Sequence, residues 1–444
     1  MRTKMIIACT MSLLLTTQPT ATAQTVLTLE ECLNRGIEQN LGLAGKRNQT
    51  VASREAVGEA RANLLPQING YFNLNDNFKP QTNVAYSPAA GSFVVSEMLQ
   101  YNAAGGVQLS MPLYNQSLYT AVEIKRLLAD ISQMQYDKAR EDLVIQICRM
   151  YYLGQTTAEQ IRLLEENIGR ISQLRDITQA LYENDVVLEV DLQRIDINLK
   201  NLRVNLKNAQ SLHQQQLNTL KYLINYKADA NIALSPIEVS QEPYVELTGV
   251  NGDMPELQLM RGQLGLRQKQ VSLVKQGYLP SLSLTGQLSW NTFSDKAAGW
   301  LDGNSTYNKW HNTYGIGVSL RIPIFDGLSK KYRLRQAKIE LQNAQTSLQD
   351  LEQNLHKEYA NATEELTNSR RSYQEQTENL RLAERVYAVT ADRYKEGLAG
   401  MTEVLQDEMS INAAQNAYVS AHYSYRNAAL TLLKLTGRLD QLTK

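Results

Sequence analysis

The sequence has few cysteines and no excess of charge of either sign, and each shortage excludes a class of protein. Three cysteines in 444 residues are too few for a disulfide framework. Lysine and arginine together number 45, as do aspartate and glutamate, so the formal net charge is zero. Because binding to nucleic acid requires a basic face, we expect no nucleic acid as a partner.

The sequence also lacks the clustered reactive residues that an enzyme needs. Its histidines are scattered along the chain at His213, His311, His356 and His422. It contains no glycine-rich phosphate loop, no cysteine–histidine pattern with metal-ligand spacing and no nucleophile motif. We therefore expect no enzymatic activity, no cofactor and no metal site.

Long hydrophobic runs are absent as well. No segment after residue 23 has 18 consecutive apolar residues, so no transmembrane helix is expected. The first 23 residues differ, because Arg2 and Lys4 precede an apolar segment at residues 5–15 and an Ala-Thr-Ala cleavage signal ends at Ala23. This pattern predicts a secretory signal peptide over 1–23. The sequence leaves open whether the two later cysteines, Cys32 and Cys148, form a disulfide.

The chain repeats itself at an interval of about 210 residues. A Leu-Pro dipeptide ending at Pro66 recurs at Pro280, 214 residues later, and Pro112 recurs as Pro323, 211 residues later. We therefore expect a first structural repeat over 24–234, a connector over 235–253 and a second repeat over 254–444.

Each repeat is predicted to contain a helix, two strands, a long helix and a return helix. In the first repeat the strands are expected at about 67–76 and 105–114, the long helix at 117–182 and the return helix at 190–225. In the second, the strands are expected at about 281–291 and 314–324, the long helix at 328–395 and the return helix at 401–436. The long loops between paired strands lie at about 78–104 and 293–312.

The four strand segments alternate apolar and polar residues. In the third segment, Leu284 and Leu288 occupy one face and Gln287 the other. A half-buried sheet in a soluble domain alternates in the same way. However, strands of roughly nine to eleven residues suit a tilted membrane crossing. All three tryptophans fall in or beside the second strand pair, where a membrane-interface girdle needs them: Trp290, Trp300 and Trp310. We therefore favour a membrane barrel.

The helical segments predict a rod, and the strands predict an oligomer. No proline or glycine occurs from residue 329 to 394, and apolar residues recur there at intervals of three and four. A helix of this length is about 100 Å long. Four strands cannot close a barrel in lipid. The chain must therefore share strands with copies of itself, eight strands from two copies or twelve from three.

These features together resemble the TolC family of outer-membrane factors over nearly the whole mature chain. The most specific match is Arg393-Tyr394-Lys395-Glu396-Gly397-Leu398 followed by Glu403-Val404-Leu405, which resembles the family's turn at the periplasmic tip. In the first repeat, Tyr182 is followed by Asp185 and Val186, with Asp185 at the position of the glycine.

The resemblance implies a mainly α fold with a small transmembrane β part. This is an internally duplicated α/β-barrel with four strands per chain, twelve strands in a homotrimer and long coiled-coil helices in the periplasm. It also implies an outer-membrane channel of a tripartite efflux or type I secretion system, surrounded by outer-membrane lipid. The partners would be a periplasmic adaptor and an inner-membrane pump. The alternative is a periplasmic coiled-coil adaptor or structural protein without a pore.

The resemblance also assigns roles to residues at the helical tip. Docking of the adaptor is expected at Tyr182, Asp185, Val186, Tyr394, Gly397, Leu398, Val404 and Leu405. Asp191 and Glu403 are expected to line the periplasmic entrance. Two positions depart from the family's pattern: Gln406 lacks the second acid of the tip motif, and Ala399 stands where some members have a gating arginine.

Overall fold

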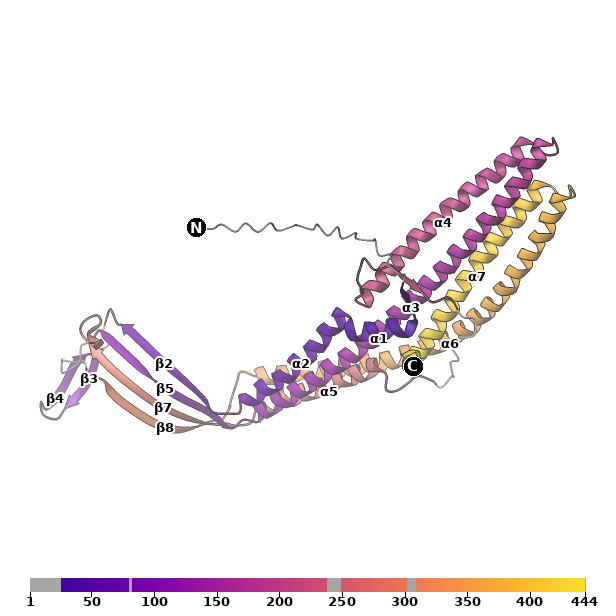
Figure 1. The fold of residues 1–444 in the computed structure, drawn as a ribbon. Helices are drawn as coiled ribbons and strands as arrows, with labels where there is room; N and C mark the ends of the chain where they lie inside the picture. Colours follow the sequence, from indigo (N-terminus) through magenta and orange to yellow (C-terminus); the bar gives the residue numbers. More distant parts are fainter. Residues whose placement is uncertain (1–24, 80–81, 238–248, 302–308, 444) are drawn as a thin grey trace, which may run out of the picture.

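The structure is a computed structural model that describes residues 25–79, 82–237, 249–301 and 309–443. A four-stranded sheet lies at one end of an elongated molecule, and long helices form the rest of it (Figure 1). The expected signal peptide over 1–23 lies outside the described residues, as do residues 238–248 of the expected connector.

Both halves of the chain contain a helix, two long strands, a long helix and a return helix in this order, and the first half has an additional helix before them. The first half contains α1 (Leu29–Gln39), α2 (Leu41–Ala62), β2 (Gln67–Asp76), β5 (Tyr101–Tyr114), α3 (Gln116–Glu183) and α4 (Glu189–Leu223). The second half contains α5 (Pro255–Gln276), β7 (Ser281–Ser294), β8 (His311–Arg321), α6 (Ser329–Lys395) and α7 (Met401–Leu435). Two short 3₁₀ helices, η1 (Gly299–Leu301) and η2 (Leu439–Thr443), complete this half.

The strand bounds differ from the predicted ones at several places. The strand β8 ends at Arg321 rather than near 324, because Pro323 has no amide N–H to donate to a ladder. The loop predicted over 78–104 contains a hairpin of β3 (Thr82–Ser87) and β4 (Ser92–Glu97). A further pair, β1 (Thr25–Leu27) and β6 (Ile232–Leu234), is parallel and joins distant parts of the chain.

The four long strands form one antiparallel sheet in the order β2-β5-β7-β8. The expected four strands per chain are therefore present in a single sheet. Within the described residues, β2 and β8 each have one edge that pairs with no other strand. Unpaired edges offer backbone N–H and C=O groups to another chain.

The long helices form two hairpins that lie side by side. The helix α3 packs against α4, α6 packs against α7, and α3 contacts α7. The hairpins therefore place α4 and α6 on opposite edges of the helical part (Figure 1). Nearer the sheet, the shorter helices α2 and α5 pack against α3, and α5 also packs against α6. Among the described residues, no helix combines the length and apolarity needed to cross a membrane.

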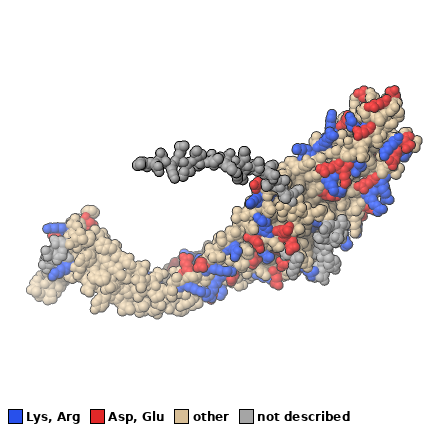
Figure 2. All heavy atoms as spheres, viewed as in Figure 1, with Lys and Arg blue, Asp and Glu red and all other residues tan. Residues whose placement is uncertain are grey.

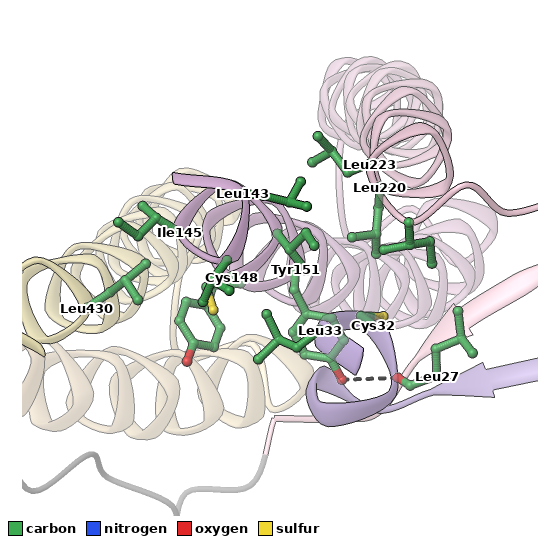
Figure 3. Packing of buried hydrophobic residues seen from close by; sticks show 14 of the residues in the cluster. Leu27, Cys32, Leu33, Leu143, Ile145, Cys148, Tyr151, Leu220, Leu223 and Leu430 are labelled. Carbon is green, nitrogen blue, oxygen red and sulfur yellow. Dashed lines mark hydrogen bonds between the residues drawn. The ribbon is translucent and has the colours of Figure 1, made fainter. Parts of the chain in front are cut away.

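The largest buried cluster lies midway along the molecule, where α1 crosses α3 (Figure 3). Tyr151 of α3 donates a hydrogen bond from its hydroxyl to the carbonyl oxygen of Leu27, 3.1 Å away. This bond fixes β1 against the long helix. The two cysteines in this cluster, Cys32 and Cys148, are buried and not paired, which answers the question that the sequence left open. Burial raises the pKa of both thiols to about 12.

Candidate functional site

One face of the four-stranded sheet is apolar over its middle and over the end next to the helices. The pairing register aligns Ile68, Leu109, Gly286 and Ile316 in one row across the four strands. Since side chains alternate along a strand, every second residue from this row shares its face. The large members of the face are Ile68, Phe72, Leu74, Val107, Leu109, Met111, Leu282, Leu284, Leu288, Trp290, Tyr314, Ile316, Val318 and Leu320. The side chain of Ile316 is 78% exposed, so this apolar face is open to its surroundings.

The opposite face of the sheet is polar and, apart from Arg321 at the end of β8, uncharged. The neighbouring row places Asn69, Gln108 and Gln287 side by side. On this face, Gln287 donates from Nε2 to the hydroxyl of Tyr71, 3.1 Å away. In the four long strands the only Asp, Glu, Lys or Arg residues are Asp76 and Arg321, and each ends its strand. The surface over the sheet accordingly shows almost no charge (Figure 2).

The three tryptophans gather at the end of the sheet that is distant from the helices. Trp290 lies late in β7, Trp310 lies just before β8, and Trp300 lies in η1 between these strands. The ring of Trp300 packs 5.8 Å from the ring of Phe72. The three residues predicted to form a membrane-interface girdle therefore lie at the same end of the sheet.

The turns at the helical tip have the same backbone geometry in both halves. In α3–α4, the amides of Asp185 and Val186 donate to the carbonyls of Tyr182 (3.0 Å) and Leu181 (2.9 Å). In α6–α7, Gly397 and Leu398 repeat this pattern with Tyr394 (3.0 Å) and Arg393 (2.7 Å). These bonds define a Schellman motif, in which the residue after the cap is left-handed. Asp185 has φ 52° and Gly397 has φ 72°, so the aspartate occupies the position of the glycine in conformation as well as in sequence.

This equivalence gives a prediction about the tip. A left-handed conformation costs a non-glycine residue roughly 1–2 kcal/mol. We expect Gly397→Ala to destabilise its turn by about that amount and Asp185→Gly to stabilise the other turn by up to about 1 kcal/mol. Hydrogen exchange of the tip amides measures both changes as local opening. Exchange rates of the tip amides that equal those of the unchanged protein in both variants would contradict the role given to the left-handed residues.

The candidate docking residues divide into exposed and buried ones. Val186 and Leu398 are 62% and 69% exposed at the apex of the two turns, and both are free to contact a partner. Tyr394 and Val404 are buried, so they hold the turn in place. The hydroxyls of Tyr394 and Thr178 lie 3.1 Å apart and connect α6 to α3. Burial raises the pKa of the Tyr394 hydroxyl.

The two candidate entrance acids occupy equivalent positions in the first turns of α4 and α7. Asp191 is the third residue of α4, and Glu403 is the third residue of α7. Acids are favourable there because the helix N-terminus carries a partial positive charge. Asp191 also accepts a bond from Arg194, 3.3 Å away, while Glu403 is exposed. Stabilisation of the helix N-terminus is sufficient to explain an acid at both positions. The two acids can line an entrance only when several copies of the chain surround it.

A polar cluster at the seam between α3 and α7 was missed from the sequence. The amide nitrogen of Asn167 donates to Asn412 (2.6 Å) and to Gln415 (2.7 Å). The buried carboxyl of Glu408 lies beside them, and burial raises its pKa although Arg170 opposes this shift. A groove of about 480 Å³ borders the seam, and half of its lining residues are Asn or Gln residues of α4 and α7. The sequence signal for this cluster was the presence of amide residues, such as Asn167 and Gln415, at core-facing positions of two long helices.

The described residues hold no group of three or more His, Cys, Asp and Glu side chains that could bind a metal ion. The candidate site therefore consists of a two-faced sheet with open edges, continued by a helical rod whose tip exposes apolar and acidic side chains.

Comparison with known proteins identifies relatives over most of the chain. The family model described as outer membrane efflux protein matches residues 33–226 and 252–438. The outer membrane protein TolC of Vibrio cholerae is 23% identical over 433 residues, covering 93% of this chain and 91% of that protein. The alkaline protease secretion protein AprF of Pseudomonas aeruginosa is 20% identical, covering 88% and 80%. The antibiotic efflux pump outer membrane protein ArpC of Pseudomonas putida is 22% identical, covering 76% and 69%.

Solved structures share the fold. The outer membrane protein VceC of Vibrio cholerae aligns with a TM-score of 0.75 at 16% identity, covering 92% of this chain and 96% of that chain. The outer membrane channel MtrE of Neisseria gonorrhoeae, solved in its open state, aligns with a TM-score of 0.72 at 19% identity, covering 94% and 90%.

Proposed function

The chain belongs to the outer membrane efflux protein family, and on this premise we propose that three copies of it form one continuous duct across the outer membrane and the periplasm. The family is one of transport proteins rather than enzymes. The protein is an outer-membrane channel with a large periplasmic helical part. The two-faced sheet with unpaired edges is the observation that carries the proposal of three copies.

The sheet supports closure into a barrel in three ways. Its apolar face suits lipid, and its polar face suits a water-filled lumen. The unpaired backbone groups at the edges of β2 and β8 are not tolerated in lipid, so both edges need partners. Since adjacent strands are antiparallel and each chain supplies four, β8 of one copy runs antiparallel to β2 of the next. Antiparallel strand pairing can therefore continue from copy to copy around a closed barrel.

Three copies fit a duct better than two. Two copies would supply eight strands, and the interior of an eight-stranded barrel is largely filled by side chains. Twelve strands leave a wider lumen, because barrel diameter grows roughly linearly with strand number.

The helical rod has matching apolar edges. On α4, the exposed residues Val190, Ile197 and Val204 recur at intervals of seven. On α6, the opposite edge helix, Leu382, Val386 and Val389 are exposed at intervals of four and three. Stripes with these spacings pack against partner helices. We assign them to contacts between neighbouring copies, arranged head to tail around a closed ring.

The tip is where cargo is proposed to enter. An antibiotic efflux pump protein and a protease secretion protein are among the relatives. We therefore assign the duct to a tripartite efflux or type I secretion system. A periplasmic adaptor would dock at the exposed apical residues Val186 and Leu398, and an inner-membrane pump would supply the cargo. Asp191 and Glu403 of three copies would ring the entrance and favour cations, as acidic rings do in pores.

Single-channel recording in a planar bilayer tests the duct and its entrance together. We expect stable cation-selective openings from the detergent-purified protein, and weaker selectivity in the Asp191→Ala/Glu403→Ala double variant. Openings with unchanged selectivity in that variant would retain the duct and remove the acidic ring. A folded protein that never inserts, and that salt alone releases from membranes, would instead be a periplasmic adaptor or structural protein without a pore.

A further inference from the structure

A group of exposed aromatic side chains lies where the sheet meets the helices. Four helices end or begin within eight residues of a sheet strand: α2 and α5 end there, and α3 and α6 begin there. Around this junction the exposed aromatic residues are Tyr114, Tyr119, Tyr278, Phe325 and Tyr332. Aromatic side chains of this kind gather at the level of lipid headgroups. The tryptophans predicted to form a membrane-interface girdle lie at the opposite end of the sheet.

A run of basic residues lies at the same level. The first turns of α6 contain Lys330, Lys331, Arg333, Arg335 and Lys338, with no Asp or Glu from residue 327 to 339. Lys331, Arg335 and Lys338 are spaced by four and three residues and therefore share one face of the helix. We call these three residues the basic stripe. All three are exposed.

Three acids on the loop and helices around the junction are paired with basic residues outside the basic stripe. Asp326 pairs with Lys330 (4.0 Å), Glu340 with Arg267 (2.8 Å) and Glu123 with Lys269 (2.7 Å). Within the described parts of the chain, the basic stripe makes no ion pair of its own. Like charges at these spacings repel one another. Without an acidic partner this repulsion is not compensated, so the stripe favours binding of an anion.

Two contacts connect the basic run to the aromatic residues. The ammonium of Lys330 lies 5.3 Å from the ring centre of Tyr278, and the guanidinium of Arg335 lies 5.9 Å from that of Tyr332. Side chains of a helix lean toward its N-terminus, which for α6 is the end next to the sheet. The long basic side chains therefore lean toward the level of the aromatic rings.

We propose that the basic stripe binds the phosphate groups of anionic phospholipids in the periplasmic leaflet of the outer membrane. The inference rests on the proposed function, in which the sheet crosses that membrane. Aromatic rings at the headgroup level would set the depth of the protein, and the basic stripe would select anionic headgroups at that depth. In a trimer the stripe occurs three times around the barrel.

Spin-labelled lipids test this assignment. The protein is reconstituted into phosphatidylcholine vesicles with a trace of spin-labelled phosphatidylglycerol or phosphatidylcholine. The motionally restricted fraction of each label then gives its relative association with the protein. We expect phosphatidylglycerol to associate at least threefold more strongly with the unchanged protein, and this preference to fall to about one in K331Q/R335Q/K338Q. Salt at 1 M should also weaken it, because the Debye length is then about 3 Å.

The triple variant K200Q/R203Q/K207Q is a matched control. It removes two lysines and one arginine from exposed positions of α4, distant from the sheet, and its preference should equal that of the unchanged protein. Equal association of both lipids with the unchanged protein would overturn the inference while the channel function stands. Loss of the trimer in K331Q/R335Q/K338Q would also overturn the inference. The stripe would then stabilise the trimer by pairing with acids of a neighbouring copy, such as Glu55 and Glu59 on α2, and would not bind lipid. Absence of any restricted lipid would mean that the protein does not insert, and the proposed function itself would fail.

Discussion

Arginine in place of Leu288 is expected to prevent the protein from assembling in the outer membrane. Leu288 lies in the middle of β7 on the apolar face, opposite Val107 and Tyr314. An arginine on the lipid face near the middle of the bilayer costs about 2–4 kcal/mol. A trimer carries the substitution three times, so the total of roughly 6–12 kcal/mol is comparable to the whole stability of a typical domain.

The neighbouring residue provides the control for this prediction. Gln287 precedes Leu288 and lies on the opposite, polar face of the same strand. We expect Gln287→Arg to assemble normally and to reduce the cation preference of the pore, because its charge lies in water. Quantifying the heat-resistant oligomer in isolated outer membranes compares the two variants. Equal assembly of Leu288→Arg and Gln287→Arg would show that the apolar face does not contact lipid.

Glutamate in place of Ile197 is expected to prevent formation of the trimer while leaving the individual hairpins folded. Ile197 is exposed in the single chain, and in the proposed trimer it lies at the centre of the apolar stripe on α4. Burying an isoleucine contributes about 1.5–3 kcal/mol. A carboxylate buried without a partner costs several kcal/mol more. The loss occurs at each of three equivalent interfaces, so association should weaken by several orders of magnitude.

Arg203→Glu is the matched control, since Arg203 is exposed on the same helix and lies about 120° around it from Ile197, away from the stripe. Light scattering of detergent-purified protein distinguishes trimer from monomer, and circular dichroism reports whether the helices remain. A stable trimer in Ile197→Glu would remove the α4 stripe from the subunit interface.

The periodic parts of the fold could be predicted from the sequence because local patterns determine them. Alternation located the strands, and the long helices differ from their predicted bounds by one or two residues at most ends. The tip turn was recognisable although Asp185 replaces glycine, because aspartate tolerates the left-handed conformation better than most residues. The sheet places the predicted apolar residues on one face, as alternation requires.

The features that were missed depend on contacts between distant residues or on weak local signals. The pairing of Thr25–Leu27 with Ile232–Leu234 joins segments about 200 residues apart, and three residues carry too little periodicity to reveal a strand. The hairpin of β3 and β4 depends on the cross-strand pairs Val84–Val95 and Tyr86–Phe93 within a segment that looked like a loop. The polar seam of Asn167 and Gln415 could not be located because a helical pattern does not show which partner helix an amide faces.

The most direct test of the account is a disulfide between the two edge strands of neighbouring copies. One cysteine replaces Asn69 in β2, and a second replaces Thr313, Gly315, Gly317 or Ser319 in turn, all on the polar face of the sheet. The thiols of Cys32 and Cys148 are buried, and their pKa of about 12 keeps them protonated. A disulfide forms only where the Cα atoms lie within about 7 Å.

If three copies close one ring, at least one of these pairs gives, after oxidation, a covalent trimer and no larger species. Asn69→Cys paired with Ile316→Cys, which lies on the apolar face, should remain uncrosslinked. Failure of all four pairs in a membrane-inserted protein, or cross-linking that stops at dimers, would contradict a twelve-stranded ring made by three copies of this chain.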